Sequence, residues 1–132
     1  KVYNDTFGHP AGDKVISAVA KTASTLLRRG TDFFARYGGE EFVAVFMGND
    51  AQSAYEFLKT IRQAVEDLHI KHNSPVSEWV TISVGGVSLV PKSEDSYETY
   101  LKLADTMLYD AKRLGRNRVV WSNGGKEQWI EK

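Results

Sequence analysis

The chain has 132 residues, and its 17 Lys and Arg residues balance its 17 Asp and Glu residues, so the formal net charge is zero. This balance argues against a surface for DNA or anionic membranes, and we expect no nucleic-acid partner. Because 42% of the residues are hydrophobic and no long apolar run occurs, the composition indicates one soluble globular domain without a transmembrane helix. The lack of cysteine excludes disulfides and thiolate chemistry and is consistent with the cytoplasm.

The start of the chain predicts that it belongs to a longer polypeptide. It begins at Lys1, and its two methionines are Met47 and Met107. A translated start would have placed Met at or just before the first residue.

The first half of the chain predicts a loop, a helix, a hairpin and a second helix. Turn formers fill residues 1–10, and apolar residues then recur at helical spacing over residues 11–29. Two short runs rich in aromatic and β-branched residues, 33–37 and 41–47, flank Gly38-Gly39 and predict a β-hairpin. A second apolar stripe predicts a helix over residues 51–68, capped by Asn49 or Asp50.

The second half predicts a strand, a helix and a short strand. Residues 79–90 alternate between apolar and polar, with Gly85-Gly86 marking a bulge or a close backbone approach. A helix over residues 97–114 ends at Gly115, and 119–121 form a last strand before a mobile tail. This mixture of a hairpin and helical crossovers predicts an α+β fold with helices packed on one sheet.

Two adjacent carboxylates stand at the tip of the expected hairpin, in Gly38-Gly39-Glu40-Glu41-Phe42. The glycines leave room for a ligand to approach the backbone, and neighbouring carboxylates repel each other unless they are solvated or hold a cation. The pattern therefore fits either a metal site or an ordinary solvated tip.

Three further clusters of polar residues have a functional and a plain interpretation. The cations from Lys112 to Arg118 could clamp phosphates or simply complement the helix dipole. Asn4, His9 and Asp13 could bind the edge of a nucleobase or serve as turn and cap residues. The pair Arg29 and Asp32 could bind a ligand or form a surface ion pair.

Together these segments resemble the GGDEF family, the diguanylate cyclase domains of bacterial signalling. Glu40 replaces the Asp of the family motif and keeps a carboxylate. The matching blocks, in order along nearly the whole chain, are Asn4-Asp5-Thr6-Phe7-Gly8-His9 with Gly12-Asp13, Arg36-Tyr37-Gly38-Gly39-Glu40-Glu41-Phe42, Thr81-Ile82-Ser83-Val84-Gly85, Ala104-Asp105, and Leu108-Tyr109-Asp110-Ala111-Lys112 with Gly115-Arg116-Asn117.

The resemblance implies a palm-like, nucleotidyl-cyclase-like fold, with a central, mostly antiparallel sheet flanked by helices. It implies that two GTP molecules condense to cyclic di-GMP with release of pyrophosphate, with Mg²⁺ or Mn²⁺ as cofactor and a homodimer in which each domain holds one GTP. Residues 1–122 would form this domain and 123–132 a C-terminal tail. The family's first strand, with its metal-binding Asp, is expected before Lys1.

The resemblance also implies roles for the matching residues. Glu40 would be the catalytic base and a metal ligand, and Glu41 a second metal ligand. Arg29 and Asp32, with Arg62 as a further partner, would bind cyclic di-GMP at an inhibitory site. The residues expected to bind GTP are Asn4, His9, Asp13, Gly38, Gly39, Lys112 and Arg116.

An alternative function is a non-catalytic cyclic di-GMP receptor that uses Arg29 and Asp32. The intact set of substrate residues favours the enzyme, since a receptor would have no use for them. We expect a cytoplasmic domain controlled by an upstream sensor or receiver domain, in a parent chain that is either soluble or membrane-anchored.

Overall fold

The computed structural model describes residues 9–26, 33–38, 41–45, 50–71, 78–124 and 126–131. The chain groups into two compact units, one formed by residues 1–49 and 64–80 and the other by residues 50–63 and 81–132. Because each unit is assembled from two separate stretches, the division does not separate successive domains along the chain. None of the helices in the described ranges is long and apolar enough to cross a bilayer.

The first unit contains helix α2 (His9–Leu26) and a two-stranded antiparallel sheet of β1 (Phe33–Gly38) and β2 (Glu41–Val45). Val19 and Ala23, one turn apart on α2, are buried as the helical spacing predicts. The expected helix and hairpin are thus confirmed where the structure describes them.

This unit also contains the end of helix α3 (Ala51–Asp67) and the segment that follows it. Val65 of α3 is fully buried. After the helix, Lys71 and Trp79 form an isolated antiparallel bridge, and the rings of His69 and Trp79 stack with centroids 4.7 Å apart. The backbone N–H of Val80 donates to the carbonyl of Ile70 at 2.7 Å.

The second unit is built on a three-stranded sheet in the order β3 (Val84–Ser88), β4 (Val119–Asn123) and β5 (Glu127–Ile130). Strands β3 and β4 are parallel, and helix α4 (Tyr97–Arg113) provides the crossover that a parallel pair requires. Strand β5 returns antiparallel to β4. The mixed helices and strands confirm the α+β class.

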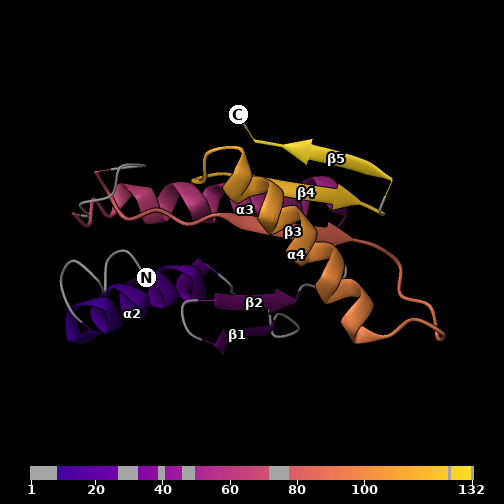
Figure 1. Ribbon diagram of the computed structural model, residues 1–132, viewed down its shortest axis with the longest axis horizontal. Coiled ribbons are helices and arrows are strands. Elements are labelled where there is room, and N and C mark those ends of the chain that lie inside the picture. Colours follow the sequence, from indigo (N-terminus) through magenta and orange to yellow (C-terminus); the bar gives the residue numbers. More distant parts are fainter. Residues whose placement is uncertain are drawn as a thin grey trace. The chain divides into compact units, whose positions relative to one another are not determined.

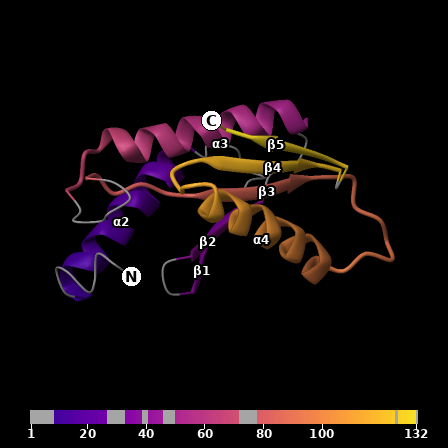
Figure 2. The ribbon, with the colours of Figure 1, turned by 45° about the horizontal axis from the view of Figure 1, so that its top comes forward.

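Helix α4 lies against one face of this sheet, in front of β3 in Figure 1 and beneath it in Figure 2. Gly85 is the point of closest approach, because a side chain there would overlap the backbone of Ala104 and Leu108. The register from Val84 opposite Val119 to Ser88 opposite Asn123 is continuous. The glycine pair therefore marks a close approach and not a bulge.

The opposite face carries aromatic residues and meets the first part of α3. A side chain at Gly86 would overlap the ring of Trp121, which is buried and donates its indole N–H to the hydroxyl of Ser88 at 2.8 Å. Trp129 lies directly opposite Trp121 on β5 and so shares its face. The ring of Tyr55 on α3 packs against Trp129 with centroids 5.5 Å apart.

Two expectations about strands were wrong. The alternating run 79–90 is not one strand, because its beginning bonds to residues 70–71 and only Val84–Ser88 pairs with β4. The tail is ordered where it is described: β4 extends to Asn123, and Glu127–Ile130 pairs with β4. Gly124 begins the intervening turn with a φ of 64°.

Candidate functional site

One of the two expected carboxylates, that of Glu41, is described at the tip of the hairpin. Strands β1 and β2 pair from Phe33 opposite Val45 to Gly38 opposite Glu41, with a register shift between Arg36 and Gly38. Glu41 begins β2 and its side chain is exposed. Gly39 and Glu40 lie outside the described residues. The pairing brings Gly38 and Glu41 to the tip, as the sequence predicted.

The candidate guanine-binding residues belong to the start of the chain. Helix α2 begins at His9, earlier than predicted, so Asp13 lies in its second turn with an exposed side chain. Gly12 beside it is buried. Asn4 and the side chain of His9 lie outside the described residues. Of this set, the structure therefore places one polar side chain, Asp13, in contact with solvent.

The candidate phosphate-binding residues are Lys112, in the last turn of α4, and Arg116, in the tight turn that follows. The backbone N–H of Arg116 folds back to donate to the carbonyl of Ala111 at 2.9 Å. Gly115, Arg116 and Asn117 have successive φ angles of 125°, 67° and 46°. Positive φ is costly for a residue with a side chain and persists only where neighbouring contacts impose it. The backbone conformation of this turn therefore depends on contacts with neighbouring residues.

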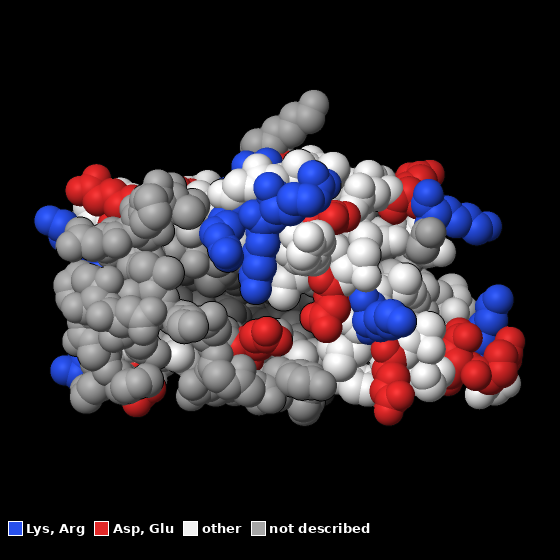
Figure 3. Space-filling view, in the orientation of Figure 1, with Lys and Arg blue, Asp and Glu red and all other residues white. Residues whose placement is uncertain are grey.

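The turn presents concentrated positive charge. Figure 3 shows Lys and Arg side chains gathered over the end of α4 and the turn that follows. Lys112 and Arg116 are exposed, and within the described part of the chain neither forms an ion pair. By contrast, the guanidinium of Arg113 approaches Asp110 at 3.6 Å. Lys112 and Arg116 are therefore open to solvent in a way that suits the binding of an anion.

Arg62 is engaged inside the second unit. Its Nε lies 2.7 Å from Oε1 of Glu131, and its Nη2 donates to Oε2 of Glu131 at 3.0 Å. Its Nη1 donates to the side-chain oxygen of Asn117 at 2.8 Å. The exposed fractions of the Arg62 and Glu131 side chains are 10% and 15%. Sequence reasoning assigned Arg62 to an inhibitory site and missed Glu131 altogether.

The other residues predicted to bind the inhibitor or a metal lie mostly outside the described ranges. Arg29 and Asp32 lie outside the described residues, as does Glu40. Among the residues that the structure describes, no group of three or more His, Asp and Glu side chains is arranged to hold a metal ion.

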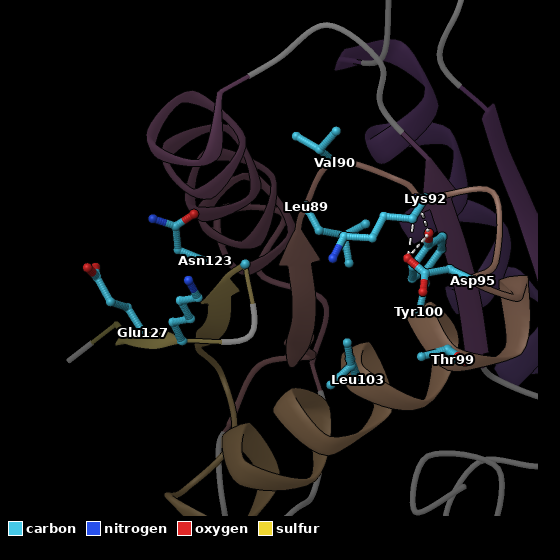
Figure 4. A pocket seen from close by; sticks show the side chains of 11 residues that line it. Leu89, Val90, Lys92, Asp95, Thr99, Tyr100, Leu103, Asn123 and Glu127 are labelled. Carbon is cyan, nitrogen blue, oxygen red and sulfur yellow. Dashed lines mark hydrogen bonds between the residues drawn. The ribbon is translucent and has the colours of Figure 1, made fainter.

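A separate pocket of about 540 Å³ lies beside the start of α4. Figure 4 shows Lys92 extending from its loop toward Leu89, while Asp95 and Tyr100 are joined by a hydrogen bond. That bond runs from the Tyr100 hydroxyl to Oδ2 of Asp95 at 2.8 Å. The pKa of Tyr100 is raised, mainly by loss of solvent around the phenol and to a lesser extent by this hydrogen bond. None of its described lining residues is among those predicted to bind substrate.

Comparison with protein families shows which family has this sequence. The family model for the diguanylate cyclase GGDEF domain matches residues 1–118. The chain belongs to the GGDEF family. The family model thus spans the hairpin and the turn with Lys112 and Arg116, and it ends before β4.

Relatives of this GGDEF domain are diguanylate cyclases. It is 38% identical over 121 residues to diguanylate cyclase VdcA of Vibrio cholerae, covering 91% of this chain and 35% of that protein. It is 40% identical over 122 residues to diguanylate cyclase A of Treponema denticola, covering 92% of this chain and 32% of that protein. The chain therefore spans about a third of the length of these relatives.

Solved structures show the same fold. The GGDEF domain of DgcB from Caulobacter crescentus, in complex with c-di-GMP, superposes with a TM-score of 0.76 at 36% identity, over 90% of this chain and 69% of that one. The active GGEEF domain of a Vibrio cholerae diguanylate cyclase gives a TM-score of 0.75 at 30% identity, over 89% and 72%. The GGEEF letters that describe the latter domain also stand at residues 38–42 of this chain.

Proposed function

We propose that this protein is a metal-dependent diguanylate cyclase. The 3′-hydroxyl of one GTP attacks the α-phosphorus of a second GTP, and the bond to pyrophosphate breaks. A second, reciprocal attack closes cyclic di-GMP and releases the other pyrophosphate. Glu40 accepts the proton of the attacking hydroxyl, and catalysis depends on in-line positioning and neutralisation of phosphate charge.

The observation that carries this proposal is the hairpin in which Gly38 pairs with Glu41. This register makes the tip short, so that Gly39 and Glu40 alone connect the two strands. Glycine leaves the backbone open to a nucleotide, and the exposed carboxylate of Glu41 is available to a cation. The same motif in an active cyclase domain supports the assignment.

Lys112 and Arg116 are proposed to bind the terminal phosphates of GTP, while Asn4, His9 and Asp13 bind its guanine end. Lys112 is exposed and has no carboxylate partner among the described residues, so it supplies a point charge, and Arg116 supplies a planar fork that matches two phosphate oxygens. Loss of one charge-assisted hydrogen bond costs about 2 kcal/mol, which is roughly thirtyfold in affinity.

This role predicts that Lys112→Ala and Arg116→Ala each weaken GTP binding by roughly thirtyfold, measured by titration with a fluorescent GTP analogue. The matched control is Arg113→Ala, which removes a neighbouring cation already paired with Asp110. We expect Arg113→Ala to bind GTP like the unmodified protein. Equal losses in all three variants would mean that only the general positive charge of the turn matters.

The donor chemistry of the hairpin tip fits Mg²⁺ or Mn²⁺, because both ions prefer carboxylate oxygens. Glu40 and Glu41 would hold the metal, and Glu41 is exposed at the start of β2. When bound, the ion neutralises negative charge that develops on the phosphates. We expect Glu40→Gln to abolish turnover while leaving the circular dichroism spectrum unchanged.

The proposal includes a homodimer, because each domain supplies one GTP and the two must face each other. It also includes product inhibition, with cyclic di-GMP bound by Arg29 and Asp32. Support comes from a solved relative that is described as a complex with c-di-GMP. Arg29→Ala should relieve inhibition by cyclic di-GMP without lowering the initial rate, and unchanged inhibition would remove this part of the proposal.

Turnover of GTP by the purified full-length protein tests the central claim. With Mg²⁺ present, we expect formation of cyclic di-GMP and pyrophosphate, with a rate per domain that rises with protein concentration as dimers form. If concentrated protein makes no cyclic di-GMP but binds it tightly, the chain is a receptor and the enzyme assignment is wrong.

A further inference from the structure

The ion pair between Arg62 and Glu131 links helix α3 to the residue that follows β5. Tyr55 and Arg62 are seven residues apart on α3 and so lie on one face of the helix, two turns from each other. Trp129 and Glu131 lie two residues apart and face that side of the sheet. The ion pair therefore continues the packing that Tyr55 and Trp129 begin.

Both oxygens of the Glu131 carboxylate are used. Its Oε1 lies 2.7 Å from Nε of Arg62 and also accepts the backbone N–H of Val119 at 3.0 Å. Its Oε2 accepts from Nη2 of Arg62 at 3.0 Å. The backbone N–H of Glu131 donates to the carbonyl of Val119 at 2.9 Å. Glu131 thus fixes the start of β4 as well as the guanidinium.

Arg62 extends this network to the turn after α4. Its Nη1 donates to the side-chain oxygen of Asn117 at 2.8 Å, and the backbone N–H of Asn117 donates to the hydroxyl of Ser83 at 3.3 Å. Asn117 is held at a φ of 46°, next to Arg116 at 67°. The contacts of Asn117 and Val119 therefore hold the chain on the C-terminal side of Arg116.

A buried ion pair is weak grounds for stability, because the loss of hydration offsets much of its attraction. The planar, bidentate geometry of this pair is better suited to fixing the position of the neighbouring residues. Here it touches a turn whose two side-chain-bearing residues at positive φ need external support. The exposed cation of that turn, Arg116, has no ion-pair partner within the described residues.

We propose that Arg62 and Glu131 are positioning residues that hold the turn of residues 115–118 in the shape with which Arg116 binds the terminal phosphates of the substrate. This inference rests on the proposed function. Glu131 lies beyond residue 118, where the match to the family model ends.

The test compares nucleotides that differ only in their phosphates. Arg62→Lys keeps the charge but loses the fork, and Asn117→Gly keeps the backbone conformation but loses the contact with Arg62. Because a displaced turn affects the terminal phosphates alone, we expect both variants to bind GTP about tenfold more weakly and GMP with unchanged affinity. Circular dichroism checks that each variant is folded, and Asn117→Gly decides the question should Arg62→Lys not fold.

Two further measurements sharpen the test. In an Arg116→Ala background, Arg62→Lys should cause no additional loss of GTP affinity, because the two residues act through one contact. The matched control is Lys59→Gln, which removes the ion pair of the half-exposed Lys59 with Glu56 one turn earlier on α3 and should leave GTP affinity unchanged.

Each outcome separates this inference from the proposed function. If the unmodified protein does not bind GTP, the proposed function is wrong and this inference falls with it. If Arg116→Ala weakens GTP binding while Asn117→Gly and folded Arg62→Lys do not, the function stands and the positioning role is refuted. Equal losses for GTP and GMP would also refute it, because they would indicate a general structural defect.

Discussion

Replacing Gly85 with Ala should force helix α4 away from strand β3. The added Cβ would lie 2.5 Å from the Cα of Leu108 and 2.6 Å from the carbonyl oxygen of Ala104, whereas ordinary contacts begin near 3.4 Å. These are backbone atoms, so no rotamer change relieves the overlap. The helix must retreat by about 1 Å, and a gap of that size removes a quarter to a half of the dispersion energy of each contact across it.

The expected cost of Gly85→Ala is about 3 kcal/mol, the upper end for overpacking, because the helix backbone itself must move. For a slope near 2 kcal/mol per molar urea, the unfolding midpoint falls by about 1.5 M. Tryptophan fluorescence reports this unfolding, since Trp121 lies buried beside Gly86 in the same sheet. This loss is a large fraction of the stability of a small protein.

Gly124→Ala is the matched control. Gly124 has a φ of 64° but nothing within 4 Å of an added Cβ, so the same substitution there tests backbone strain without a clash. We expect it to cost about 1 kcal/mol. If Gly85→Ala lowers the urea midpoint no further than Gly124→Ala does, α4 does not press on β3 in the way described.

Two further predictions concern pH. Hydrogen bonds from Ser53, chiefly from its backbone N–H at 2.7 Å, lower the pKa of Asp50. This cap therefore stabilises α3 fully at pH values above the ordinary Asp pKa, and the stabilisation is lost as the pH falls through the folded-state pKa. The difference in urea midpoint between the protein and Asp50→Ala should therefore shrink as the pH falls below the ordinary Asp pKa of about 3.9, and a constant difference would contradict the cap. Burial raises the pKa of Tyr55, so its contribution is complete below the unfolded value of about 10 and is lost as the pH rises through the folded-state value. Tyr55→Phe should lessen the alkaline loss of stability, and an unchanged alkaline decline would place the cause elsewhere.

Local pattern predicted the helices well, because each has an apolar stripe that must be buried. The structure begins α3 at Ala51 and α4 at Tyr97, as expected, and of the two candidate caps Asp50 accepts the N–H of Ser53. The hairpin followed from Gly38-Gly39 in the same way. These features depend on residues that are close together in the sequence.

Features that depend on distant partners were missed. The sequence Asn123-Gly124 is a hairpin signal, but the run after it does not alternate clearly, and we interpreted the glycines as a sign of mobility. Strand β5 pairs with β4, and its Trp129 packs against Tyr55 on α3, a partner more than 70 residues away. Similarly, nothing local to Arg62 indicates that its guanidinium meets a carboxylate 69 residues away.

That separation has a consequence for how the protein folds. Contact between Arg62 and Glu131 closes a loop of just over half the chain, which is entropically costly until β3, α4 and β4 have assembled. The ion pair should therefore form after the rate-limiting barrier. Stopped-flow measurements on Arg62→Lys should show faster unfolding and an almost unchanged refolding rate. A contact that forms late in folding would then control how long the native state persists before it unfolds.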